Sequence, residues 1–136
     1  CNFGALHTVP EKYRSRQLYE WNSQVTLMRT NVAENRSIGK LLAETVNQCA
    51  GPVAVVLPMR GVSMLDAPGG PFWDEEADRA CYEALKEVVR PGVRIMEIDA
   101  NINDPVFADI AANVLLEMLT GDVERTRAAG ALMESR

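Results

Sequence analysis

The stretch VAVVLP, residues 53–58, is a continuous apolar run rich in β-branched side chains. Such a run is typical of a strand buried on both faces, as the strands of parallel sheets are. A second core strand is expected over VRIMEID, residues 93–99, where apolar and polar side chains partly alternate. Two strands make a thin sheet. We therefore expect the chain either to be an incomplete portion of a larger α/β domain or to oligomerise.

A helix is predicted before the first strand. Asn31 is a good N-cap and Glu34 completes a capping box, while Gly51 and Pro52 end the helix. Helical spacing predicts a buried face made of Ile38, Leu41, Leu42, Thr45, Val46 and Cys49.

Two further helices are predicted, one after each strand. The first begins at Asp74 and runs to about residue 89, with an inner face of Ala77, Ala80, Cys81, Ala84, Leu85 and Val88. The second has Asp104 as N-cap, Pro105 in its first turn and Gly121 at its end. Its predicted buried stripe is Val106, Phe107, Ile110, Ala111, Val114, Leu115, Met118 and Leu119.

Strands that alternate with helices indicate right-handed βαβ crossovers. The predicted fold class is therefore α/β, a Rossmann-like parallel sheet with flanking helices. We expect one α/β segment over residues 1–136. It comprises an irregular region 1–30, a βα core 31–121 and a terminal helix or tail 122–136 beginning at Asp122. Within the first region a short strand is plausible at 17–22, and 23–30 is either extended or a loop.

Composition excludes several function classes. The net charge of −5 and the pI of about 4.9 argue against a nucleic-acid surface and a polybasic membrane contact. No apolar run approaches the ~20 residues of a membrane span. Three widely spaced cysteines form no disulfide framework, and we expect Cys49 and Cys81 to be buried and the protein to be cytoplasmic. His7 is the only histidine, so we expect no metal site of the zinc type.

Polar residues gather in the loops that follow the two strands, residues 59–73 and 99–104. Ligands of open α/β sheets bind at the carboxyl ends of the strands, so these loops are the predicted small-molecule site. The candidate ligand-binding residues are Arg60, Gly61, Ser63, Asp66, Gly69, Gly70, Asp99, Asn101 and Asn103.

The chemistry of this site stays open. Arg60 and the amides of Gly69 and Gly70 could hold an anion, or Asp66 and Asp99 could hold a divalent cation. The acidic first turn of the following helix would repel a phosphate at the helix itself. Ser63 lacks a convincing base, so the catalytic residues are unknown.

Each candidate also has a structural interpretation. The two glycines could simply form a turn, and Asn101 and Asn103 are common turn formers. Arg60 could pair with Asp66 or Asp99. An alternative function is a dimerisation or protein-interaction module, supported by apolar loop residues expected to be exposed, namely Met64, Leu65, Phe72 and Trp73.

Five strings together resemble one family: NFG (2–4), TVPEKYR (8–14), QVTLMRTNVAEN (24–35), LPMRGVSMLDAPGGPFWDEEAD (57–78) and NINDPVFAD (101–109). They are similar to the uncharacterised proteins of bacteria, fungi and plants that are related to the inhibitory N-terminal part of the tomato mosaic virus resistance protein. The likeness extends from about residue 2 to residue 119.

The resemblance implies a fragment of a longer protein. Proteins of this family are about three times as long, with two α/β domains, and this segment is similar to their last third. They are often described as ATP-binding and as dimers. The implied cofactors of the full-length protein are ATP and Mg²⁺, and the implied partners are the missing N-terminal portion, a second copy and a small-molecule ligand. An opening Cys1 in place of Met also leads us to expect a C-terminal fragment.

Overall fold

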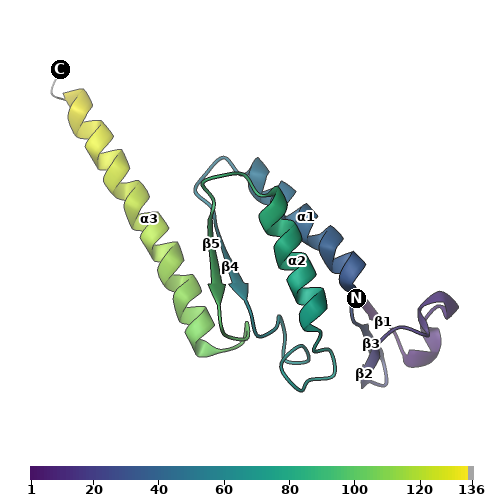
Figure 1. Cartoon of the computed structure of the whole chain (residues 1–136). Helices are drawn as coiled ribbons and strands as arrows, with labels where there is room; N and C mark the ends of the chain where they lie inside the picture. The colour runs from purple at the N-terminus through teal and green to yellow at the C-terminus, as the bar shows by residue number, and fades with distance from the viewer. Residues whose placement is uncertain (135–136) are drawn as a thin grey trace.

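A two-stranded parallel sheet lies at the centre of the computed structural model, which describes residues 1–134 and the side chains of residues 1–121 (Figure 1). Strand β4 (Ala54–Pro58) pairs with β5 (Arg94–Ile98) in a register that runs from Ala54↔Arg94 to Pro58↔Ile98. The predicted parallel α/β arrangement is therefore confirmed. Among the described residues the outer edges of both strands pair with no further strand.

Helices cover the sheet in layers (Figure 1). Helix α2 (Glu75–Val88) packs on one face through Cys81 and Tyr82, which form a core cluster with Leu57 and with the partly buried Val55 and Ile95. Helix α1 (Val32–Gln48) packs on α2, and α3 (Pro105–Glu134) lies against the other side of the sheet. No helix among the described residues is both long enough and apolar enough to span a bilayer.

The predicted N-caps of α1 and α2 are confirmed at atomic detail, whereas the Asp104 carboxylate, predicted to cap α3, accepts from the amide of Asn101. The Asn31 side chain accepts from the amide of Glu34, whose carboxylate accepts from the amide of Asn31 in return. Asp74 accepts from the amide of Ala77 in the same way. These caps depend on residues within one helical turn, which is why the sequence predicts them well.

The predicted buried face of α1 is wrong. Leu41 is 63 % exposed, Ile38, Leu42 and Cys49 are also exposed, and the buried positions are Asn35, Gly39 and Ala43. The helix turns its small residues toward α2, since a Cβ on Gly39 would lie 2.1 Å from the Cys81 carbonyl oxygen. Close contact between backbones thus determines the buried face. The larger apolar side chains remain uncovered by residues 1–121.

The inner face of α2 follows the prediction, with Cys81 buried, and it adds two residues that the pattern omitted, Asp78 and Tyr82. The stripe of α3 is narrower than predicted. Phe107 and Val114 are buried, whereas the apolar residues left exposed are Val106, Leu115, Leu116 and Leu119. Gly121 does not end this helix, which continues to Glu134 without a break at Asp122.

The first 30 residues are more regular than expected. Strands β1 (Asn2–Phe3), β2 (Leu18–Asn22) and β3 (Val25–Met28) form an antiparallel sheet in the order β1-β3-β2. Two 3-10 turns lie between the first two strands, at Leu6–Thr8 and Glu11–Tyr13. The short strand predicted at 17–22 is therefore present, and of the two alternatives left open for 23–30 the extended one is found. This small sheet borders the start of α1 and the loop that follows β4 (Figure 1).

Candidate functional site

The loops that follow β4 and β5 lie together, as predicted. The amide of Met59 donates to the Ile98 carbonyl at 2.8 Å, and the amide of Arg60 donates to Ala100 at 3.1 Å. In return the amide of Ile102 donates to the carbonyl of Gly61 at 3.1 Å. Parallel pairing therefore continues past the strand ends and fixes one loop against the other.

Asn101 is the main link between these loops. Its buried side-chain amide donates to the carbonyls of Arg60 (3.0 Å), Ser63 (3.0 Å) and Asp66 (3.1 Å). The Asn101 side-chain oxygen accepts from both nitrogens of Asn103. The side chains of Asn101 and Asn103 thus stabilise the conformation of the two loops.

The glycines also serve the loop. Gly61 has a φ of +102°, and a Cβ there would lie 1.8 Å from the Asp66 carbonyl oxygen. Gly70 approaches Leu65 closely, and its amide already donates to Ala67 at 2.7 Å. Gly69 has a φ of +82° and open space around it. The structural interpretation, a turn, thus accounts for Gly69 and Gly70. The Gly70 amide already donates a hydrogen bond, so it is not free to bind an anion.

Arg60 pairs with Asp99 and not with Asp66. The closest nitrogen and oxygen are 3.5 Å apart, and both side chains are largely exposed, so this pair contributes little to stability. Asp66, by contrast, is 2 % exposed and faces a different arginine. Within the described part of the chain, no group of three or more acidic, cysteine or histidine side chains could hold a metal ion.

A buried ionic cluster of Arg29, Asp66 and Asp78 lies beside these loops. Arg29 follows β3, Asp66 belongs to the loop after β4, and Asp78 lies on the inner face of α2. The Arg29 Nη2 atom lies 2.6 Å from Asp78 Oδ1 and 3.4 Å from Asp66 Oδ1, and Nε donates to the Phe72 carbonyl at 2.9 Å. Because the loop bends back to make this bond, Phe72 is buried, contrary to prediction, while Met64 remains 78 % exposed. Leu65 and Trp73 are half-buried.

The cluster carries more negative than positive charge. Burial raises the pKa of Asp78 from its ordinary 3.8 to about 6; Arg29 opposes the shift and Asp66 adds to it. Asp66 Oδ1 and Asp78 Oδ2 are buried and accept no hydrogen bond from any described residue. Burial also raises the pKa of the neighbouring Tyr82, whose hydroxyl donates to the Pro58 carbonyl at 2.9 Å.

A pocket of about 580 Å³ opens against this cluster, between the small antiparallel sheet and the loop after β4. Its apolar wall is formed by Trp21, Leu27, Met28, Met64, Leu65 and Phe72. Its polar groups include Arg29, Thr30, Ser63 and Asp66. Of the nine predicted site residues, Ser63 and Asp66 line this pocket. Arg60, Gly61, Gly69, Gly70, Asp99, Asn101 and Asn103 do not.

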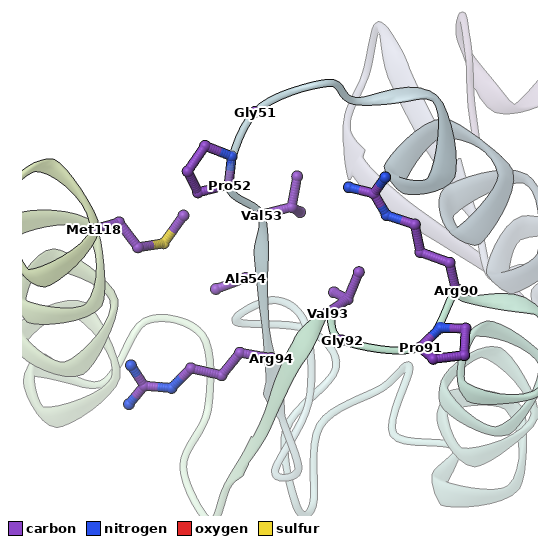
Figure 2. A pocket seen from close by; sticks show the side chains of 10 residues that line it. All are labelled: Gly51, Pro52, Val53, Ala54, Arg90, Pro91, Gly92, Val93, Arg94 and Met118. Atoms are coloured by element: carbon purple, nitrogen blue, oxygen red, sulfur yellow. The ribbon is translucent and has the colours of Figure 1, made fainter. Parts of the chain in front are cut away.

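A second pocket, of about 340 Å³, lies at the amino ends of β4 and β5 (Figure 2). Two arginines line it, but both guanidinium groups are engaged by the protein. Arg90 donates to the Cys49 carbonyl at 3.0 Å, and Arg94 pairs with Glu117 at 2.8 Å. In open α/β sheets ligands bind at the opposite, carboxyl end of the strands, so the first pocket is the stronger candidate.

Sequence reasoning missed two members of the cluster. Asp78 was visible in principle, because it precedes Cys81, Tyr82 and Leu85 at spacings of three, four and seven, which place it on the inner face of α2. Arg29 had no such signal. Its partners lie 37 and 49 residues further along the chain, and no local pattern connects them.

The fold and the pocket beside Arg29 and Asp66 define an α/β domain with a candidate ligand site at the carboxyl end of its parallel strands. Residues 1–119 match the family described as the C-terminal domain of an uncharacterised protein family, UPF0261. The chain belongs to that family.

Three relatives show the extent of the match. A UPF0261 protein of Clostridium tetani is 44% identical over 119 residues, which are 87% of this chain and 30% of the relative. The UPF0261 protein mlr3387 of Mesorhizobium japonicum is 45% identical over 116 residues, 84% of this chain and 29% of the relative. The tomato protein named ToMV resistance protein Tm-1(GCR237) is 38% identical over 119 residues, 86% of this chain and 16% of that protein. The chain thus spans less than a third of these relatives, and the predicted family is confirmed.

Proposed function

We propose that this chain supplies a small-molecule binding site to a longer protein, and that the ligand occupies the pocket beside Arg29 and Asp66. One observation carries the proposal: the pocket combines an apolar wall with a few buried polar groups at the carboxyl end of β4. Its volume of about 580 Å³ falls within the roughly 300–1,000 Å³ that is typical of ligand sites.

A nucleotide is the first ligand to test, with ATP and Mg²⁺ as the proposed cofactors of the full-length protein. Of the parts of a nucleotide, the pocket suits the base better than the phosphate groups. Arg29 is already engaged by two carboxylates, so it has little attraction left for a phosphate, whereas an adenine ring fits an apolar wall and carries an amino donor.

Thermal unfolding of the full-length protein with ATP, ADP and adenosine, each with and without Mg²⁺, tests this proposal. A ligand at a hundred times its dissociation constant stabilises the folded state by about 2.7 kcal/mol. Met64→Glu in the pocket wall should abolish that stabilisation. Met59→Glu is the matched control, because Met59 lies in the same loop but outside the pocket. Equal responses of the two variants, or a full-length structure whose own side chains fill the pocket, would contradict the proposal.

A second candidate function is an interface, with the rest of the protein or with a second copy. It is favoured by the exposed apolar side chains of α1 and α3 and by the open edges of β4 and β5. Mass measurement by light scattering distinguishes the two partners. Leu41→Glu should dissociate a dimer that uses α1, whereas an unchanged oligomer with lowered stability would indicate a contact within one chain. The three free cysteines favour a reducing compartment, and we propose the cytoplasm.

A further inference from the structure

We propose that Asp66 and Asp78 share a single proton, which holds the loop after β4 against α2 and leaves the pair as pH rises. Asp66 belongs to that loop, and Asp78 lies on the inner face of α2. The shared proton needs no ligand. Its effect on the pocket, whose wall the loop forms in part, rests on the proposed function.

Each of the two carboxyl groups has one oxygen that lacks a donor. Asp78 Oδ1 accepts from Arg29 at 2.6 Å and Asp66 Oδ2 accepts from the amide of Val62 at 3.1 Å. The other two oxygens, Asp66 Oδ1 and Asp78 Oδ2, are buried and accept from no described residue. The carboxyl groups also lie within hydrogen-bonding reach of each other. Because an ionised carboxylate can only accept, a hydrogen bond between the two requires that one of them is protonated.

The balance of charge favours the same state. Arg29, Asp66 and Asp78 are 8 %, 2 % and 6 % exposed, so the charges of all three are largely removed from water. The neighbouring titratable groups on α2 are Cys81 and Tyr82, and burial raises the pKa of both, which keeps them neutral. Two ionised carboxylates would leave one buried negative charge uncompensated, which is costly. One proton on the pair makes the cluster neutral.

The proton joins the pocket wall to the core. Leu65 and Phe72 of the loop line the pocket, and the Phe72 carbonyl accepts from Arg29 Nε at 2.9 Å. When the proton passes to bulk water, two carboxylates repel each other. Helix α2 is fixed by its core cluster, whereas the loop borders solvent, so the loop is the part that moves away.

The direction of the pH effect follows from the chemistry of the pair. Burial raises the pKa of Asp78 from 3.8 to about 6, and its hydrogen bond with Asp66 and the charge of Asp66 add to the rise. The folded state therefore keeps the proton to higher pH than the unfolded state does. The contact between the loop and α2 is fully present in acid and is lost as pH rises through about 6.

Hydrogen exchange of the full-length protein without ligand tests the inference, with peptides that cover residues 62–73. Protection should fall about tenfold from pH 5 to pH 7.5 after correction for intrinsic rates, as the two pKa values imply. Asp78→Asn and Asp66→Asn each replace one acid with an amide that donates to the remaining carboxylate and does not titrate. Both variants should keep the acid level of protection at both pH values. Asp109→Asn, an exposed position on α3, should retain the fall.

Three outcomes would overturn the inference. If Asp66→Asn keeps the tenfold fall, the proton belongs to Asp78 alone and is not shared. If protection of residues 62–73 does not change with pH, the proton does not hold the loop. If a variant fails to fold, carbon NMR of the aspartate side chains in the unmodified protein decides. Two carboxyl carbons should then shift with one common midpoint near pH 6, and the absence of such a pair refutes the sharing.

The test is independent of the proposed function, because it uses no ligand. A tenfold fall that both Asn variants remove supports the shared proton even if no nucleotide binds. Binding of the nucleotide series to a protein whose loop shows no pH dependence supports the pocket and refutes the shared proton.

Discussion

Replacing Asp78 with Asn should flatten the dependence of local stability on pH. The pKa of Asp78 is raised to about 6 from 3.8 because the carboxyl group is buried. The folded state therefore retains the proton to higher pH than the unfolded state does, so Asp78 lowers stability as pH rises through this window. Linkage between these two values gives a loss of about 1–2 kcal/mol from pH 5 to pH 7.5. An Asn side chain does not titrate in this pH range, so the Asp78→Asn variant should not show this loss of stability.

Hydrogen exchange followed by mass spectrometry gives the required local measurement in the full-length protein. Peptides that cover residues 75–88 report the opening free energy of α2, once rates are corrected for the intrinsic effect of pH. Asp109→Asn is the control, because that carboxyl group is exposed and its loss should leave the slope of the unmodified protein. If Asp78→Asn keeps the slope of the unmodified protein, the assignment of the raised pKa to Asp78 is wrong.

Three further predictions concern the loops and the core. Gly61→Ala should unfold the loop, since the new Cβ would lie 1.8 Å from the Asp66 carbonyl oxygen. Gly92→Ala, at a φ of +90° with no described atom nearby, should cost only about 1–2 kcal/mol of backbone strain. Thermal unfolding followed by circular dichroism compares the two variants. Asn101→Ala should lose about 1–3 kcal/mol because it leaves buried carbonyls without donors, and Asn103→Ala less than half of that, as judged by exchange in residues 59–66. Tyr82→Phe should cost about 0.5–1.5 kcal/mol by losing one buried hydrogen bond, and an unchanged melting temperature would show that this bond contributes nothing.

Local signals in the sequence predicted much of the fold. The apolar run 53–58, the caps at Asn31 and Asp74, and the glycine and proline punctuation each depend on residues within a few positions of one another. They correctly predicted β4, β5 and the starts of α1 and α2, and the order of these elements predicted the parallel sheet. The adjacency of loops 59–73 and 99–104 followed from that topology.

Other features depend on partners that the sequence does not name. Periodicity identified the apolar face of α1 around Leu41, but small residues such as Gly39 form the contact with α2. The polar loop residues were predicted as ligand contacts, which stays a prediction, and several of them, such as Asn101 and Asn103, form hydrogen bonds within the loops. The cluster at Arg29 was missed because it joins three elements that are remote in sequence.

That remoteness has a consequence for folding during synthesis. Arg29 and Asp78 are separated by 49 residues, which takes roughly 2–10 s to translate at about 5–20 residues per second. The β1-β3-β2 sheet can assemble well before α2 exists, while the Arg29 guanidinium is still hydrated. Formation of the ion pair is thus a late event that requires the loop, α2 and the small sheet at once. A stalled chain that ends just before residue 78 would therefore hold Arg29 without Asp78, the closer of its two carboxylate partners.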